Sequence, residues 1–337
     1  MQYEMEFFYF YLKFISAFCV AFMITFYLVA AFRSLALKFN ITDSPDGKLK
    51  NQKQPVAYLG GVAVFLGFVI SLAILYPNSK EIYLLLPLTF LLLLGLLDDL
   101  IALSPLIKFA GQFLAAIGFV RLGFYISFDF FPEYLNMGLT VFWYLSVINA
   151  VNLVDIMDGL ATSLCMVSLA SFFIFSVLLY QNALALFLVL LLGCVAAFFC
   201  YNREPATIYL GDAGSLFLGG CVASVPLLIN WTIITPLGIL APFLILCIPL
   251  LEISQLVLIR TYKRIPFYRG SPDHFAHYLM RNGWSKIAII DYVYVLSIFL
   301  FFLSYWLVFE AASLSRLIIL FILFLIVWAF CLIRKNT

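Results

Sequence analysis

Polar side chains recur at every third position in the stretch NAVNLVDIMDG, which ends at Gly159. They are Asn149, Asn152, Asp155 and Asp158. Three residues turn an α-helix by about 300°, so successive members are neighbours and predict a tilted polar ridge. If the helix breaks before Gly159, the last Asp moves toward the cytosol. Polar packing between helices is the simpler interpretation, and a site for chemistry is the one that we favour.

Further carboxylates close or open other apolar runs. Asp98 and Asp99 end the run LLLLGLLDD, and Asp212 lies in YLGDAGS. Each also has a structural interpretation, since Asp98 or Asp99 alone is typical of a solvated helix end and Asp212 of an N-cap. The GDAGS stretch additionally offers close backbone approach and free N–H groups at a helix start, which suit an anion.

The two histidines, His274 and His277, lie three residues apart in SPDHFAHYLMRNGW. Two imidazoles without a local third ligand are a weak pattern for zinc. Beside cations such as Arg269 they are typical of a phosphate cradle, with a basic loop at lipid headgroups as the alternative.

Clustered carboxylates beside cations suit a hard metal ion and a phosphorylated substrate. Mg²⁺ prefers oxygen ligands, usually one or two carboxylates together with phosphate oxygens. Such an ion neutralises charge on a transferring phosphoryl group, and a spare Asp deprotonates or positions a nucleophile.

The elements that must position these residues are apolar. Of 337 residues, 65% are hydrophobic and 11% charged. Soluble domains are about 25% charged, and apolar runs of about 20 residues each suffice to cross a bilayer. The composition predicts an all-α polytopic membrane protein of one domain, residues 1–337. About eleven spans are expected, at 7–32, 57–76, 82–97, 106–123, 137–153, 160–180, 183–200, 213–230, 235–258, 287–309 and 313–333.

The basic residues orient these spans. Fifteen of the 19 Lys and Arg fall on one side, which the positive-inside rule makes cytoplasmic. The N-terminus is then outside and the C-terminus inside. The cytoplasmic loops that result contain the five carboxylates and both histidines, and they run over 33–56, 98–105, 154–159, 201–212 and 259–286. A membrane location favours a lipid as one substrate.

Four motifs, LLDDL (96–100), NAVNLVDIMDGLA (149–161), YLGDAGS (209–215) and SPDHFAHYLMRNGW (271–284), resemble those of the polyprenyl-phosphate N-acetylhexosamine-1-phosphate transferases, glycosyltransferase family 4. The resemblance covers about residues 40 to 290. It implies transfer of a sugar-1-phosphate from a UDP-sugar to undecaprenyl or another polyprenyl phosphate, with release of UMP. It also implies Mg²⁺ or Mn²⁺, the cytoplasmic face of a bacterial inner membrane, and a cell-envelope glycan such as the lipopolysaccharide O-antigen as the later product.

The resemblance also implies roles for residues. Asp98 and Asp99 are expected near the metal and the acceptor phosphate, and Asp98 is the favoured base. Metal ligands are expected at Asp212 and Asp155. Asp155 is also expected, with Asp158, among the catalytic residues that hold the metal-bound diphosphate or the nucleotide. Substrate-binding residues are expected at Asn149, Asn152, Lys53, His274, His277 and Arg269.

Two motifs depart from the family pattern. In PVAYLGG, Ala57 and Tyr58 replace a Pro and an Arg, so Lys50 or Lys53 is expected to supply a cation there. In the histidine loop, Ala276 replaces one His of an HxHH-type pattern.

The histidine loop is similar to that of the branch using UDP-N-acetylglucosamine. The muropeptide-transferring branch has a run of three His, which is absent here. UDP-MurNAc-pentapeptide or a modified UDP-sugar remains the alternative substrate. The expected partners are the UDP-sugar, the polyprenyl phosphate and membrane lipids, without nucleic acid, and a homodimer is left open.

Other classes of protein fit less well. A transporter or flippase would have ionisable groups and broken helices near mid-membrane. The acids of the motifs lie at one face, and Glu252, inside an expected span, is the exception. No partner for Glu252 follows from the sequence. A CDP-alcohol phosphatidyltransferase needs a DGxxAR pattern, and DGLATS lacks the Arg. A scaffold protein would have no need of the acidic motifs.

Overall fold

The structure is a computed structural model that describes residues 2–43, 55–75, 80–266, 271–310 and 314–332. Helices dominate it, and within the described residues the one sheet is a short antiparallel pair, β1 (Thr42–Asp43) and β2 (Val56–Ala57). The elements gather into two compact units, Met1–Ile229 and Asn230–Thr337. That the chain acts as a single domain stays a prediction.

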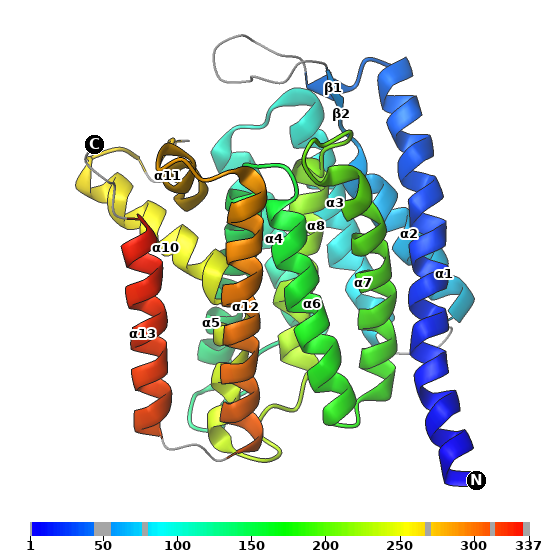
Figure 1. The fold of residues 1–337 in the computed structure, drawn as a ribbon, viewed down its shortest axis with the longest axis vertical. Coiled ribbons are helices and arrows are strands. Elements are labelled where there is room, and N and C mark those ends of the chain that lie inside the picture. The colour runs from blue at the N-terminus through cyan, green and yellow to red at the C-terminus, as the bar shows by residue number, and fades with distance from the viewer. Residues whose placement is uncertain (1, 44–54, 76–79, 267–270, 311–313, 333–337) are drawn as a thin grey trace. The chain divides into compact units, whose positions relative to one another are not determined.

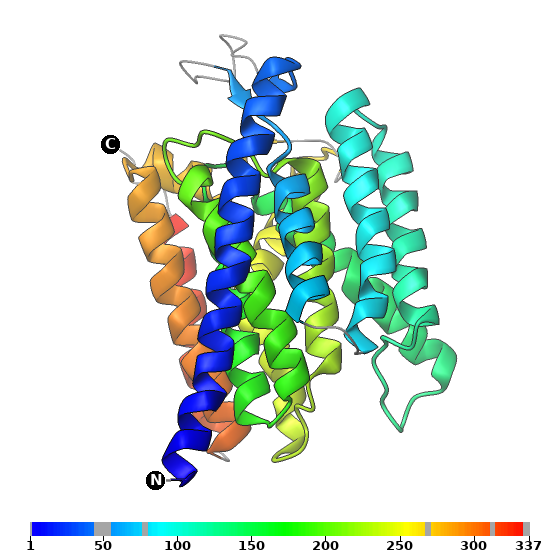
Figure 2. The same ribbon diagram turned by 90° about the vertical axis from the view of Figure 1, so that its right-hand side faces the viewer.

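The first unit holds the elements that carry the acidic motifs (Figure 1). Its helices are α1 (Gln2–Lys38), α2 (Gly60–Leu75), η1 (Lys80–Leu84), α3 (Leu85–Ile101), α4 (Pro105–Arg121), α5 (Glu133–Val154), α6 (Leu160–Leu178), α7 (Asn182–Asn202), α8 (Gly211–Ser224) and η2 (Val225–Leu228). Helix α1 lies against α2 and α7, as the turned view shows (Figure 2).

Helix α8 lies at the centre of this unit. It packs against α2, α3 and α5. Glycines permit the closest approaches, because a Cβ at Gly95 of α3 would collide with the carbonyl of Asp212, and a Cβ at Gly214 with the backbone of Gly61. The end of α3 is therefore held against the start of α8, although the two are far apart in the sequence.

A tight turn joins α3 to α4. Ala102 adopts a left-handed conformation with φ of 49°, and its N–H donates to the carbonyl of Asp98, which ends α3. Ser104 then caps α4 by accepting a hydrogen bond from the Ile107 N–H, and Pro105 occupies the first turn. This turn brings Lys108, one turn into α4, back toward the end of α3.

The second unit contains a broken helix. Its elements are η3 (Pro236–Leu240), α9 (Ala241–Ile245), α10 (Cys247–Tyr262), α11 (Phe275–Arg281), α12 (Lys286–Phe309) and α13 (Leu314–Leu332). The expected span at 235–258 coincides with two helical segments, Pro236–Ile245 and α10, which meet at a bend of 69°. Pro249 explains the break, since it has no N–H to donate to the carbonyl of Ile245 and its ring would clash there.

The protein is a polytopic membrane protein. Among the residues that the structure describes, seven helices are long and apolar enough to cross a bilayer, or eight if the bent pair counts as one span. Helices occupy all the ranges expected from the sequence, but several are shorter than this criterion requires.

Candidate active site

The motif that contains Asn149 and Asp158 is only partly helical. Helix α5 ends at Val154, Asp155 leaves helical geometry with φ −82° and ψ 55°, and Gly159 adopts a left-handed φ of 74°. The expected ridge of four is therefore wrong beyond its second member. Asn149 and Asn152 project from α5, whereas both Asp residues lie in the following turn, as the expected loop at 154–159 requires.

A cavity of about 310 Å³ opens where this turn meets the start of α8. Five Asp side chains line it, together with two tyrosines and Asn202. The acids are Asp43, Asp99, Asp155, Asp158 and Asp212. Three of the four catalytic residues expected from the sequence, and both expected metal ligands, thus share one cavity.

Asp99 binds the start of α8. Its Oδ1 accepts from the Asp212 N–H at 2.8 Å and its Oδ2 from the Ala213 N–H at 3.0 Å. Gly211 permits this contact, because a Cβ there would lie 2.6 Å from Oδ2 of Asp99. The start of α8, which the sequence predicted to bind an anion, is therefore occupied by the carboxylate of Asp99. Asp212 is not the N-cap of α8.

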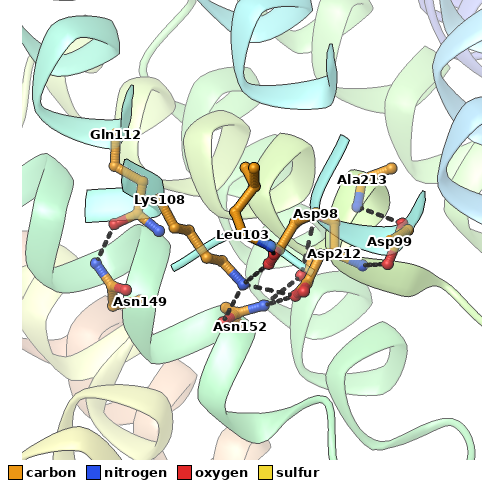
Figure 3. A network of polar contacts seen from close by, with 10 residues as sticks. Asp98, Asp99, Leu103, Lys108, Gln112, Asn149, Asn152, Asp212 and Ala213 are labelled. Carbon is orange, nitrogen blue, oxygen red and sulfur yellow. Dashed lines mark hydrogen bonds and ion pairs between the residues drawn. The ribbon is translucent and has the colours of Figure 1, made fainter. Parts of the chain in front are cut away.

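Lys108 connects the acids of α3 and α8 behind the cavity wall. Its Nζ lies 2.9 Å from Oδ2 of Asp98 and 2.9 Å from Oδ1 of Asp212. Asn152 joins this network through Oδ1, at 3.4 Å from the same Nζ, and its amide donates to Asp212 and to Ser215 (Figure 3). One ammonium thus links three of the expected functional residues.

Asp98 and Asn149 also form hydrogen bonds that hold neighbouring elements together. Oδ1 of Asp98 accepts from the Leu103 N–H at 2.7 Å, within the turn after α3. The amide of Asn149 donates to Oε1 of Gln112 at 2.6 Å and joins α5 to α4 (Figure 3). Asp98, Asn149 and Asn152 do not line the cavity. A direct contact of Asn149 with substrate stays a prediction.

The carboxyl groups of the cavity affect one another's ionisation. Burial, together with the charges of Asp212, Asp99 and Asp158, raises the pKa of Asp155 to about 8. Asp158 accepts a hydrogen bond from the Ala206 N–H at 3.2 Å, so its carboxylate is fixed toward the loop before α8. A group whose pKa is raised by its neighbours marks a place where an added cation is stabilised.

The donor set fits a hard divalent cation. No group of three or more His, Cys, Asp or Glu side chains within the described part of the chain converges closely enough to hold a metal by itself. Mg²⁺ commonly takes only one or two carboxylates and completes its shell with phosphate oxygens and water. Asp212 and Asp155 line one cavity and supply such oxygens.

Two tyrosines form the aromatic part of the cavity wall. The rings of Tyr58 and Tyr209 lie 6.1 Å apart at an interplanar angle of 60°. Burial and nearby carboxylates raise the pKa of Tyr58, and the pKa of Tyr209 to about 12, so both hydroxyls stay protonated. The side chain that replaces the family's Arg is therefore a neutral donor at this cavity.

Within the second unit, His274 immediately precedes α11 and His277 lies in its first turn. Their rings are 5.6 Å apart and nearly perpendicular. Burial, with the charges of His274 and Arg281, lowers the pKa of His277 and favours the neutral imidazole. Contact of either histidine with substrate phosphate stays a prediction.

Other expected residues cannot be placed, and some relevant ones were missed. Lys50, Lys53 and Arg269 lie outside the described residues. No motif in the sequence predicted a role in the site for Lys108, Gln112 or Asp43. A signal existed for the first two, since they stand four residues apart, on one face of an otherwise apolar stretch of α4.

Comparison with known proteins identifies the family of this chain. The model of glycosyl transferase family 4 matches residues 81–230. A phospho-N-acetylmuramoyl-pentapeptide-transferase of Carboxydothermus hydrogenoformans is 31% identical over 279 residues, which are 74% of this chain and 83% of that protein. The chain belongs to glycosyl transferase family 4. As a member it is a transferase, and the matched segment contains every acid of the cavity except Asp43.

Other relatives extend the similarity of this family 4 chain beyond the first unit. A probable undecaprenyl-phosphate N-acetylglucosaminyl 1-phosphate transferase of Bacillus subtilis is 29% identical over 93% of this chain and 89% of that protein. A phospho-N-acetylmuramoyl-pentapeptide-transferase of Staphylococcus carnosus is 27% identical over 85% of this chain and 97% of that protein. Relatives with two different substrate names thus resemble it about equally.

Proposed function

We propose that this family 4 transferase moves N-acetylglucosamine-1-phosphate from a UDP-sugar to undecaprenyl or another polyprenyl phosphate and releases UMP. The observation that carries the proposal is the acid cavity at the start of α8, where Asp212 adjoins Asp99 and the Asp155–Asp158 turn. Asp155 and Asp212 share this cavity, and Lys108 links Asp212 to Asp98, which supports binding of a metal-bound diphosphate there. The names of both relatives support transfer of a phosphorylated N-acetylhexosamine, and the name of the Bacillus subtilis relative supports undecaprenyl phosphate as the acceptor.

The choice of sugar rests on the histidine loop and on one relative. The loop has His274 and His277 without a run of three His. The Bacillus subtilis relative is named for N-acetylglucosaminyl 1-phosphate transfer. UDP-MurNAc-pentapeptide, which the names of the other relatives suggest, and a modified UDP-sugar are the alternatives. The names of these relatives do not mention lipopolysaccharide or O-antigen, and the proposed product is simply a lipid-linked precursor of a cell-envelope glycan.

In the proposed reaction an oxygen of the lipid phosphate attacks the sugar-bearing phosphorus of the UDP-sugar. The bond from that phosphorus to the bridging oxygen breaks, and UMP leaves with the bridging oxygen. Asp98 is the proposed base for the acceptor phosphate. Its Oδ2 contacts the ammonium of Lys108, a side chain that could also pair with a phosphate, whereas backbone N–H groups of α8 hold both oxygens of Asp99.

The remaining roles follow from position. Asp155 and Asp158 are proposed to hold the diphosphate or the nucleotide end of the donor, and Asn152 to orient Asp212. Asp212 and Asp155 would hold Mg²⁺ or Mn²⁺. When bound, that ion would neutralise charge on the transferring phosphoryl group and on the leaving UMP.

We further propose eleven spans with the N-terminus outside and the acid cavity at the cytoplasmic face of a bacterial inner membrane. The distribution of Lys and Arg supports this orientation. Helices shorter than the usual span, such as α2, are accepted as crossings because they are continuously apolar.

The first test is UMP release by the purified protein with undecaprenyl phosphate, Mg²⁺ and a panel of UDP-sugars. We expect release with UDP-N-acetylglucosamine that EDTA abolishes and added Mg²⁺ restores. Release only with another UDP-sugar rejects the proposed sugar and keeps the class. Absence of release with every sugar, from folded protein, rejects the proposed function.

A further inference from the structure

Glu252 is a carboxylate buried inside the second unit. It lies in the second turn of α10, and its side chain is fully inaccessible to solvent. An ionised carboxylate at such a position is costly unless it is paired and hydrogen-bonded. The structure supplies the partner that the sequence could not name, because Oε1 of Glu252 lies 2.8 Å from Nδ1 of His274.

The second oxygen of Glu252 is used as well. Oε2 accepts a hydrogen bond from the Phe275 N–H at 3.3 Å, which is the first helical N–H of α11. One carboxylate therefore fixes both the ring of His274 and the backbone just after it. Since the side chain of His274 is only 7% exposed, the ring has little freedom to adopt another orientation.

Helix α10 anchors the same segment at two further points. Nε of Arg260 donates to Oγ of Ser271 at 3.0 Å, and Nζ of Lys263 contacts Oδ1 of Asp273 at 2.6 Å. These contacts already attach the segment to α10. A carboxylate at position 252 is therefore not needed to attach the segment to α10. The distinctive feature of Glu252 is its hydrogen bond to an imidazole.

His274 in turn packs against His277. The two rings meet edge to face, and the residue His277 is more exposed than His274. Nδ1 of His277 is buried next to the carbonyl of Pro272, although the two do not form a hydrogen bond of standard geometry. Because Nδ1 is enclosed, Nε2 is the nitrogen of His277 that is left for a ligand, and its direction depends on the ring of His274 behind it.

We propose that Glu252 is a positioning residue, which holds His274 as the Nδ1–H tautomer and through it sets the ring of His277 for contact with substrate phosphate. A carboxylate only accepts hydrogen bonds, so Nδ1 of His274 must donate and Nε2 is left for other contacts. The contact of His277 with phosphate rests on the proposed function, whereas the tautomer of His274 does not.

The variant E252Q separates this role from a merely structural one. The amide of Gln has the shape of the carboxylate, and its oxygen still accepts from the Phe275 N–H. Its NH₂ group then faces Nδ1 of His274 and donates to it, which forces the proton of the ring to Nε2. Both hydrogen bonds survive in number, but the tautomer is reversed.

The tautomer is measured by NMR on protein labelled with ¹⁵N-histidine. The chain contains 2 His, so at most four ring nitrogens are observed, and H277N assigns them. We expect a protonated Nδ1 at His274 in the wild type and a protonated Nε2 in E252Q. A neutral Nε2–H tautomer in the wild type overturns the proposal without reference to activity.

The kinetic consequence is measured as UMP release with the wild type, E252Q, E252D and the control E310Q, which alters an exposed Glu in the same unit. We expect kcat to fall about 10- to 100-fold in E252Q, the loss of one well-placed hydrogen bond to a charged group, with KM changed less than about threefold. E252D keeps an acceptor and should recover most of kcat, and E310Q should match the wild type.

The outcomes are distinguishable. A reversed tautomer with unchanged kcat in E252Q overturns the positioning role. If E252Q fails to fold, the wild-type spectrum and E252D decide, because E252D must keep the Nδ1–H tautomer. Failure of the wild type to release UMP overturns the proposed function, and the tautomer of His274 is then judged by the spectra alone.

Discussion

The acid cavity of the first unit and the α10–α11 segment of the second unit treat negative charge in opposite ways. In the cavity, five Asp side chains share one space. In the α10–α11 segment each buried acid has its own partner, Glu252 with His274 and Asp273 with Lys263 and Tyr278. Concentrated carboxylates indicate a place for a ligand, whereas individually paired carboxylates indicate residues that hold something else in position.

The effect on pKa values follows the same division. Neighbouring acids help to raise the pKa of Asp155 to about 8. In the other unit burial acts against ionisation of Asp273, but the hydrogen bond from Lys263 nevertheless holds its pKa below the usual value. The first carboxylate gains stability by accepting a cation, and the second already has one.

The largest effect is expected from D212N, which removes the negative charge that pairs with Lys108 and lines the cavity. UMP release should fall at least about 1,000-fold, because an oxygen ligand and a preorganised charge are lost together. D129N, in an exposed loop of the same unit, is the matched control and should retain full activity. Ample residual turnover in D212N would contradict a role in metal binding.

The next largest effect is expected from K108M. It leaves Asp98 and Asp212 without the ammonium that both contact at 2.9 Å. Breaking a buried ion pair by removing one partner costs about 3–5 kcal/mol, so the thermal midpoint in detergent should fall by several degrees. UMP release should also fall, by about 100-fold. A variant of normal stability would show that the acids tolerate each other without Lys108 and would weaken the contrast between the units.

A pH effect of intermediate size sharpens the contrast. Because the folded-state pKa of Asp155, about 8, lies above its ordinary value of about 4, the fold favours the protonated acid. Stability in EDTA should therefore fall as pH rises from about 4 to 8, by up to about 1.4 kcal/mol per pH unit, and then level off.

The measurement is the thermal midpoint against pH, for the wild type and for D155N. Because D155N has no carboxyl group at this position, its midpoint should fall less than that of the wild type as pH rises toward 8. Parallel curves for the two proteins would mean that Asp155 is already ionised in the fold and that its neighbours do not crowd it.

The smallest effect is expected from K263M. Lys263 is exposed on its outer side, and Tyr278 still donates to Asp273 when the ammonium is removed. UMP release should change less than about threefold, since exposed ion pairs contribute little. A loss as large as that expected of E252Q would show that attachment of the segment to α10, and not the imidazole, is what matters.

The sequence predicted the character of the fold well because hydropathy is a local property. Each expected span coincides with helix, and the loop at 154–159 begins where α5 ends. The ridge from Asn149 to Asp158 was wrong beyond Asn152, and the bend within 235–258 was not predicted, both for backbone reasons. Gly159 allows a left-handed turn, and Pro249 cannot continue the hydrogen bonds of α9, so residue spacing alone did not reveal either change of direction.

The sequence by itself determined that this is a helical membrane protein with acidic motifs like those of family 4, because runs of apolar residues and short motifs are read without knowing what they touch. Only the tertiary structure decided that Asp99 caps α8, that Lys108 joins Asp98 to Asp212, and that Glu252 belongs to His274. The partners within each of these contacts lie on different elements. Which charge meets which depends on how closely helices approach, and at α3 and α8 glycines such as Gly95 set that distance.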